Sequence, residues 1–243
     1  MTRLTVMVMV VMLISACAWA MDAKDVLDKV ESVLEAPADR VAEVKLILTD
    51  KDGKTTERGM KLWEQGDKKL IKFTAPADVR GVGLLVLEED QMYLWLPALG
   101  RIRRISAGEK GKSFMNTDFS YEELGSSGYE DDYEGTIIEE TDSTWTLELV
   151  RKEGADATYS KLVMVVHKSD FLPRKIVFYN DSGEAVKELV NEEVKKIGKY
   201  IVPTRMVMTD LKKSHKTKMV MENVEFDTGL STNVFTKRNL KRR

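Results

Sequence analysis

Two histidines and scattered carboxylates are the side chains of this sequence that could carry acid–base chemistry. His167 ends one expected strand and His215 precedes another, so both are expected to be structural or exposed residues. No serine lies in a Gly-x-Ser-x-Gly elbow, and no Walker loop, dinucleotide fingerprint or His-Glu-x-x-His motif occurs. A pair of carboxylates that meet in space stays open as a site, because one sequence does not reveal such pairing. The sequence therefore favours a protein that is not an enzyme and needs no cofactor.

One acidic run has residue types that bind metal ions. Glu130-Asp131-Asp132 with Glu134 could bind calcium, but the run lacks the alternating ligands and the glycine of a calcium loop. We expect a solvated strand edge there and no metal site.

Two basic groups could recognise anions. Arg101, Arg103 and Arg104 lie in one basic strand. Because guanidinium presents a fork of donors, these arginines could meet anionic headgroups or latch a lid through its backbone carbonyls. An exposed charged face is the plainer interpretation of each. The second group ends the chain, and an anionic membrane surface, an acidic partner or a disordered terminus would explain it: Lys237, Arg238, Lys241, Arg242 and Arg243.

The first twenty residues have the pattern of an export signal. Arg3 gives a positive start, and residues 4–16 form an apolar stretch shorter than the roughly 20 residues that a spanning helix needs. Residues 18–20, Ala-Trp-Ala, have the small-x-small form of a cleavage site. We therefore expect residues 1–20 to be a signal peptide and the mature chain to begin near Met21, in the periplasm.

Cys17 is the single cysteine of the sequence and has two interpretations. With residues 14–16 it resembles a bacterial lipobox, so a lipid anchor at Cys17 is the alternative to plain secretion. In either case the mature chain has no internal disulfide, and its stability must come from packing. The 38 basic and 40 acidic residues give a net charge of −2, which supplies no global positive field. Nucleic acid is therefore not expected as a partner.

Hydrophobic periodicity predicts one helix followed by many strands. Val26, Val30 and Leu34 recur at helical spacing, and Pro37 ends the pattern. From Val41 the period changes to two, with short turns that make neighbouring strands antiparallel. Further strands are expected at 129–140, 144–151, 161–167, 173–179, 185–195, 200–209 and 216–226. We expect a single domain from 21 to 243, mainly β with helices, built as a large curved antiparallel meander sheet or a partial barrel.

Residues 113–125 interrupt this strand pattern. Phe114, Met115 and Phe119 lie in the segment, with Asp118 as a candidate helix cap. The segment could be a lid over a concave sheet face, or a crossover whose aromatic side chains fill the core. The two interpretations can describe one object, a helical lid or plug in the concave face.

The export signal, the N-terminal helix and a series of motifs together carry a family resemblance. The motifs are Phe73-Thr-Ala-Pro76, Gly81-Val-Gly83, Tyr93-Leu-Trp-Leu-Pro97, Arg101-Ile-Arg-Arg-Ile105 and Phe114-Met-Asn-Thr-Asp-Phe-Ser-Tyr121. Over nearly all of the mature chain, the sequence resembles the outer-membrane lipoprotein-sorting protein family with the LolA-like fold. The resemblance implies an incomplete antiparallel β-barrel closed by helices, whose apolar cavity carries acyl chains across the periplasm. It also implies a candidate partner, an inner-membrane permease of the resistance-nodulation-division type.

Acyl-chain binding would need apolar side chains that face such a cavity. Burial contributes about 0.8 kcal/mol per methylene, so roughly twelve methylenes contribute on the order of 10 kcal/mol before ordering costs. The expected lipid-binding residues come from the strands and the lid: Leu46, Leu48, Met60, Leu62, Ile71, Phe73, Tyr93, Trp95, Phe114, Met115 and Phe119. The leading hypothesis is a periplasmic carrier or chaperone that moves a lipid or lipoprotein towards the outer membrane. The alternative is a non-shuttling sensor or accessory subunit of a membrane transport permease.

Overall fold

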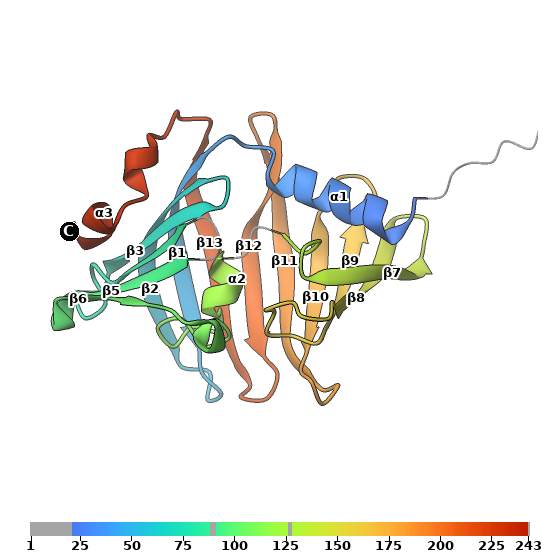
Figure 1. Cartoon of the computed structure of the whole chain (residues 1–243), viewed down its shortest axis with the longest axis horizontal. Helices are drawn as coiled ribbons and strands as arrows, with labels where there is room; N and C mark the ends of the chain where they lie inside the picture. Colours follow the sequence, from blue (N-terminus) through green and yellow to red (C-terminus); the bar gives the residue numbers. More distant parts are fainter. Residues whose placement is uncertain (1–20, 88–90, 126–127, 243) are drawn as a thin grey trace, which may run out of the picture.

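The computed structural model describes residues 21–87, 91–125 and 128–242, so the expected signal peptide and Cys17 lie outside the described residues. One curved sheet dominates the molecule, with helices on both of its faces (Figure 1). The helices are α1 (Ala23–Leu34), α2 (Tyr121–Gly125) and α3 (Lys237–Lys241), with 3-10 turns η1 (Pro97–Leu99), η2 (Ala107–Glu109) and η3 (Thr232–Val234). Within the described ranges, no helix is long and apolar enough to cross a membrane.

The sheet has thirteen strands in the spatial order β6-β5-β4-β3-β2-β1-β13-β12-β11-β10-β9-β8-β7, and neighbouring strands are antiparallel. Their bounds are β1 (Arg40–Thr49), β2 (Thr55–Gln65), β3 (Lys68–Ala75), β4 (Gly83–Leu87), β5 (Gln91–Leu96), β6 (Arg101–Arg104), β7 (Tyr133–Glu140), β8 (Thr144–Arg151), β9 (Lys161–His167), β10 (Pro173–Tyr179), β11 (Ala185–Ile197), β12 (Tyr200–Asp210) and β13 (His215–Phe226). The sheet ends at β6 and β7 and does not close, which confirms the predicted incomplete barrel.

One expected strand begins later than the sequence pattern suggested. Residues 129–132 form a turn in which the Tyr133 N–H donates to the Tyr129 carbonyl at 2.9 Å, and β7 starts only at Tyr133. Glu130, Asp131 and Asp132 therefore lie in this turn, where Lys24 of α1 pairs with Glu130, and only Glu134 lies on the edge strand β7. No cluster of His, Cys, Asp or Glu among the described residues has the arrangement of a metal site.

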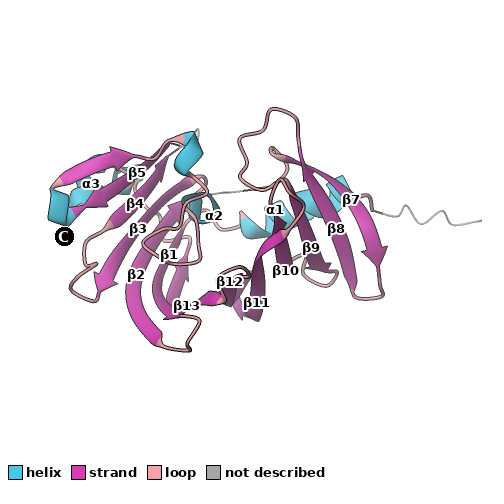
Figure 2. Ribbon diagram, turned by 90° about the horizontal axis from the view of Figure 1, so that it is seen from below, coloured by secondary structure: helices cyan, strands magenta, loops and turns pink. Residues whose placement is uncertain are grey.

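Helix α1 forms as its sequence predicts. Asp22 is the N-cap, and its side chain and that of Asp25 bond reciprocally to each other's backbone N–H groups in a capping box. Val26, Leu27 and Val30 form one buried face. This face packs against β7 and β12, so α1 lies across the concave side of the sheet (Figure 2).

Strand alternation separates the apolar side chains into two clusters on opposite faces of the sheet. Ile71 and Leu84 belong to the large cluster that includes α1, whereas their neighbours Leu70 and Leu85 belong to a small cluster with α3. Because successive side chains of a strand point to opposite faces, the large cluster fills the concave face and the small one lies on the outer face. The sheet is thus buried on both sides at β3 and β4.

Candidate functional site

The strand order forces one segment to cross the concave face. Strands β6 and β7 follow one another in sequence but form opposite edges of the sheet. The connection between them therefore passes over the concave side, between the two wings seen in Figure 2. We call residues 113–125, the central part of this connection, the plug. The predicted helical lid or plug in the concave face is this crossing segment, and its action as a lid stays a prediction.

Aromatic side chains fix the plug to the sheet. Phe114, Phe119 and Tyr121 are buried in the large cluster. The Phe114 ring stacks on Phe73 of β3 with 5.4 Å between ring centroids, and it meets Tyr121 edge-on at 5.7 Å. Aromatic pairs in these arrangements are favourable beyond the area that they bury. The plug thus occupies the apolar surface that the sequence assigned to acyl chains.

The backbone of the plug is folded tightly on itself. Met115 and Asn116 have left-handed φ angles of 51° and 60°, and the Thr117 hydroxyl donates to the Phe114 carbonyl at 2.8 Å. At the start of α2, the Ser120 hydroxyl accepts from the Glu123 N–H at 3.1 Å, and the Glu123 carboxylate accepts from the Ser120 N–H at 2.6 Å. This is a capping box built on Ser120.

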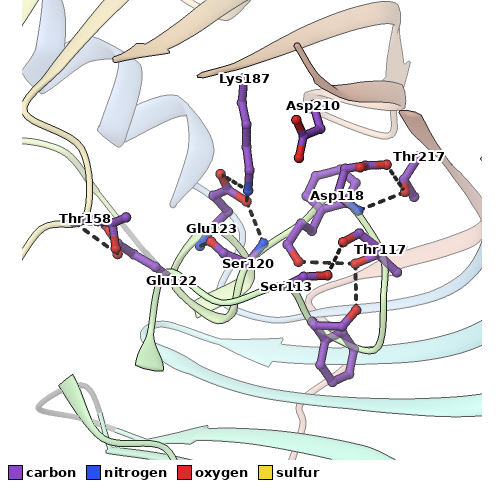
Figure 3. Close-up of polar contacts among 12 residues, drawn as sticks. Ser113, Thr117, Asp118, Ser120, Glu122, Glu123, Thr158, Lys187, Asp210 and Thr217 are labelled. Carbon is purple, nitrogen blue, oxygen red and sulfur yellow. Dashed lines mark hydrogen bonds and ion pairs between the residues drawn. The ribbon is translucent and has the colours of Figure 1, made fainter. Parts of the chain in front are cut away.

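Asp118 anchors the plug to the sheet instead of capping the helix, which corrects the sequence-based expectation. Its buried carboxylate accepts from the Thr217 hydroxyl at 2.7 Å and lies 2.7 Å from His215 Nδ1. The Thr217 hydroxyl in turn accepts from the Asp118 backbone N–H at 3.0 Å (Figure 3). Thr217 belongs to β13 and was not identified from the sequence. A β-strand partner 99 residues away out-competes the local helix start, where Ser120 already provides the cap.

Glu123 forms a second anchor, on the opposite side of the plug. Its carboxylate accepts from Lys187 Nζ of β11 at 3.0 Å and from the Tyr159 hydroxyl at 2.6 Å (Figure 3 shows the lysine contact). The Lys187 and Glu123 side chains are only 14% and 8% exposed. Burial, together with the negative charge of Glu123, raises the pKa of Tyr159 far above its ordinary value, so this hydroxyl stays protonated and donates. Buried charges are tolerated when they are paired in this way.

Two further contacts hold the plug, one at Glu122 in α2 and one at the Met115 carbonyl. The Glu122 carboxylate accepts from the Thr158 N–H at 3.0 Å, and burial raises the pKa of Glu122 despite this contact. Arg58 of β2 donates to the Met115 carbonyl, and its guanidinium lies 5.8 Å from the Phe73 ring centroid. Arg58 is thus a latch to a plug carbonyl. The sequence analysis missed it, although Arg58 shares its strand face with Met60 and Leu62, where a charged residue is unusual.

Among the described residues, Arg101, Arg103 and Arg104, the candidates from the sequence for a lid latch or headgroup contacts, do not contact the Met115 carbonyl that Arg58 binds. Arg103 Nη1 lies 2.6 Å from Glu109 Oε1, and this contact raises the pKa of Arg103 and lowers that of Glu109 to about 2. Arg103 therefore supports the connection just before the plug through the Glu109 carboxylate, and it also interacts with the side chain of Tyr121 in the plug. Arg101 and Arg104 are exposed on the edge strand β6.

The expected lipid-binding residues divide between the two faces of the sheet. Seven of them are buried in the large cluster, and two more are partly buried against it: Leu46, Leu48, Met60, Ile71, Phe73, Phe114 and Phe119, with Leu62 and Met115. Tyr93 and Trp95 lie apart from these, in the small cluster on the outer face. Their neighbours Met92 and Leu94 face the large cluster instead, because a shift of one residue along a strand reverses the face.

The chain is similar to one protein family and to several solved structures. The model of a family described as "Uncharacterized protein" matches residues 65–242, and the chain belongs to this family. A DUF1329 family protein from Desulfovibrio piger superposes with a TM-score of 0.82 and 26% identity, over 90% of this chain and 98% of that one. No curated protein matches the chain.

Two other solved structures define the fold. A putative outer membrane lipoprotein-sorting protein domain from Vibrio parahaemolyticus has a TM-score of 0.81 and 29% identity, with 90% of this chain and 98% of that chain covered. LolA superfamily protein NE2245 from Nitrosomonas europaea has a TM-score of 0.75 and 22% identity, with 90% and 100% covered. The fold is that of the LolA-like, outer-membrane lipoprotein-sorting proteins, which confirms the family resemblance drawn from the sequence.

Proposed function

We propose that the protein is a non-enzymatic periplasmic carrier that binds acyl chains of a lipid or lipoprotein on its concave face, for transfer towards the outer membrane. One observation carries the proposal: the apolar concave face is covered by a plug whose attachments to the sheet include several specific polar contacts. A cover of this kind can leave and return without unfolding the sheet, because the strands are bonded to each other and not through the plug. The likeness to a putative lipoprotein-sorting domain from Vibrio parahaemolyticus supports the same function.

The free energy gained by burying the plug aromatics is comparable to that gained by burying an acyl chain. Burying Phe114, Phe119 and Tyr121 contributes about 1.5–3 kcal/mol each, or roughly 5–9 kcal/mol together. Roughly twelve methylenes of an acyl chain contribute on the order of 10 kcal/mol. An acyl chain could therefore replace the plug aromatics on the sheet at little net cost. The polar anchors at Asp118 and Glu123 then decide how readily the exchange occurs.

A disulfide across the first anchor tests this proposal. The Thr217 hydroxyl lies within 3.0 Å of both backbone and side-chain atoms of Asp118, so cysteines at the two positions fall within reach of each other. The variant carries Asp118→Cys and Thr217→Cys with Cys17→Ser, and binding of a fluorescent fatty acid is measured before and after reduction. We expect the oxidised form to lose binding, because its plug cannot leave, and the reduced form to bind at least as well as the wild type.

The same protein provides its own control, since reduction changes only the cross-link. Intact mass confirms that the disulfide has formed, and a short thiol-reactive cross-linker serves if it has not. Equal binding by the oxidised and reduced forms would show that the acyl chain does not use the surface under the plug. Transfer of lipid between vesicles then separates a carrier from an accessory subunit of a permease, because only the carrier moves lipid without a partner.

A further inference from the structure

The outer face of the sheet carries a second covering element, the C-terminal helix α3. Leu240 is fully buried there between β4 and β5, and a Cβ atom at Gly83 would lie 2.8 Å from its Cδ1 atom. Lys72 Nζ of β3 donates to the carbonyl groups of Asn239 and Arg242 at the end of the helix. Residues 237–242 therefore pack on the sheet, which differs from the disordered terminus considered from the sequence, and Arg243 lies outside the described residues.

Two segments that carry basic but no acidic residues contribute to this end of the molecule. Residues 91–108 contain three arginines and no Asp or Glu, and residues 228–243 contain five Lys or Arg and no Asp or Glu. The whole chain, by contrast, carries 38 basic and 40 acidic residues. Strand β5 and helix α3 lie at the same end of the sheet in both views, and β6 pairs with β5 there (Figures 1 and 2). Two acid-free segments that are far apart in sequence thus meet in space.

Five side chains define what we call the basic face: Arg104, Lys237, Arg238, Lys241 and Arg242. Arg104 pairs with Tyr93 in the β5–β6 register, so its side chain leaves the sheet on the side that α3 covers. All five residues are exposed, and within the described residues none of them forms an ion pair with a carboxylate. Four of them line an open pocket of about 430 Å³: Lys237, Arg238, Lys241 and Arg242.

Among the described residues, the groups beside the basic face supply no carboxylate that forms an ion pair with it. Burial and the positive charge of Arg242 lower the pKa of Lys72, which donates to backbone carbonyls of α3. Lys237 Nζ lies 3.8 Å from the centroid of the Tyr93 ring, a cation–π contact in place of a salt bridge. An anionic surface would therefore gain several charge contacts here without displacing an existing ion pair.

Aromatic residues around α3 indicate what kind of anionic surface fits. Trp63, Tyr93 and Trp95 are partly exposed on the same face, and Leu99 beyond the end of β5 is 56% exposed. Trp and Tyr side chains are enriched where a protein meets the headgroup region of a bilayer, because one end is apolar and the other is polar. Basic side chains beside them attract anionic lipids.

We propose that the basic face docks on the surface of a bilayer that contains anionic phospholipids, and so holds the protein against a membrane. The contact is peripheral, through headgroups, and lies on the face of the sheet opposite the plug. It does not depend on acyl-chain binding at the concave face. A membrane could thus be engaged while the concave face stays accessible.

Vesicle flotation tests this inference on the full chain. The probes are vesicles of phosphatidylcholine with phosphatidylglycerol and vesicles of phosphatidylcholine alone. The basic-face variant carries Arg104→Gln, Arg238→Gln, Lys241→Gln and Arg242→Gln, which leave Leu240 and the backbone contacts of Lys72 in place. We expect the wild type to bind only the anionic vesicles, more weakly as salt rises, and the variant to bind them at least about tenfold more weakly.

A charge-matched variant controls for net charge. Lys51→Gln, Lys54→Gln, Lys196→Gln and Lys216→Gln remove four exposed lysines outside the basic face, and we expect binding to change by less than about twofold. Equal binding by wild type and the basic-face variant, or binding that ignores salt, would overturn the inference. So would failure of the wild type to bind anionic vesicles while it captures an acidic protein through the same residues.

Fatty-acid binding in solution separates the two proposals. The basic-face variant should bind the fluorescent fatty acid as the wild type does, because its substitutions lie on the outer face. Loss of vesicle binding with intact fatty-acid binding supports docking alone. A wild type that docks on vesicles but binds no fatty acid would overturn the carrier proposal and leave docking standing.

Discussion

The plug and the C-terminal helix both cover an apolar cluster of the same sheet, but they are attached in different ways. The plug is anchored by the buried side chains of Asp118 and Glu123, each paired with side chains on distant strands. Helix α3 is held by the fully buried Leu240, seated over Gly83, and by Lys72 contacts to its backbone carbonyls. Both covers bury apolar side chains, but only the plug adds buried, paired polar side chains to them. In the proposed function these polar pairs are the contacts that open when the plug is displaced, whereas α3 stays seated.

The largest effect is expected from removing the cation of the plug anchor. Lys187→Met leaves the Glu123 carboxylate buried without a positive partner, a change that costs about 3–5 kcal/mol when the surroundings stay closed. If the plug is displaceable, it opens instead. Hydrogen exchange of residues 113–125 should then accelerate strongly, while the free energy of global unfolding in urea falls by less than this amount.

Lys187→Arg is the matched control, because it keeps the charge and should leave both measurements close to the wild type. A loss of global stability with unchanged exchange in the plug would mean that the plug unfolds only with the sheet, and the contrast between the two covers would fail.

Leu240→Ala tests the other cover. Leu240 is 0% exposed, and its truncation should lower the free energy of unfolding by about 2–5 kcal/mol in urea denaturation. Leu99→Ala, at a site that is 56% exposed, should change it by no more than about 0.5 kcal/mol. Similar small effects at both leucines would indicate that α3 is only loosely held.

Gly83→Ala sharpens the same point from the sheet side. The added Cβ would lie 2.8 Å from Leu240 Cδ1 and 3.2 Å from the Ile71 carbonyl oxygen, so the Leu240 side chain or α3 must shift, at a cost of about 1–3 kcal/mol. Gly108→Ala is the matched control, since nothing lies within 4 Å of its Cβ position. A thermal melt in which the two alanine variants behave alike would contradict the close seating of the helix.

The smallest effect concerns pH. Asp39 is buried and accepts from the backbone N–H groups of Thr228, Gly229 and Leu230, where the C-terminal segment leaves the sheet. Burial alone would raise its pKa, but these hydrogen bonds outweigh it and lower the pKa below the ordinary value of 3.8. The stability from Asp39 is therefore fully present above about pH 3.8 and is lost as the pH falls through the lower folded value.

Asp39→Asn should accordingly be less stable than the wild type at neutral pH, and the difference should narrow below about pH 3.8. Urea unfolding of the two proteins across this range measures it, with the exposed Asp142→Asn as control. A difference that stays constant with pH would show that the carboxylate charge does not secure the C-terminal segment.

Most of the fold could be predicted from the sequence because strand periodicity and turns are local signals. The strands at 144–151, 161–167 and 173–179 have the predicted bounds. The pairing of β1 with β13 has no local signal, since the two strands lie far apart in sequence. The face of β5 was harder to predict, because its two faces are both apolar. Met92 and Leu94 face the large cluster, whereas Tyr93 and Trp95 face the small cluster with α3.

The candidate site was predictable only in its apolar part. Phe114 and Phe119 were found because aromatic residues cluster in the sequence. The polar anchors were not, since Thr217 and Lys187 become partners of the plug only after β11 and β13 take their places in the sheet. Arg58 had a detectable signal, because it precedes the apolar Met60 and Leu62 on one strand face.

The central seam of the sheet has a consequence for how the chain folds. Strand β1 pairs on one side with β13, so the middle of the sheet joins the first strand of the chain to the last. Pairings between distant segments form slowly, because the loop between them must close first. A chain that is synthesised from its N-terminus therefore cannot complete its hydrophobic core until β13, the last strand, has been made.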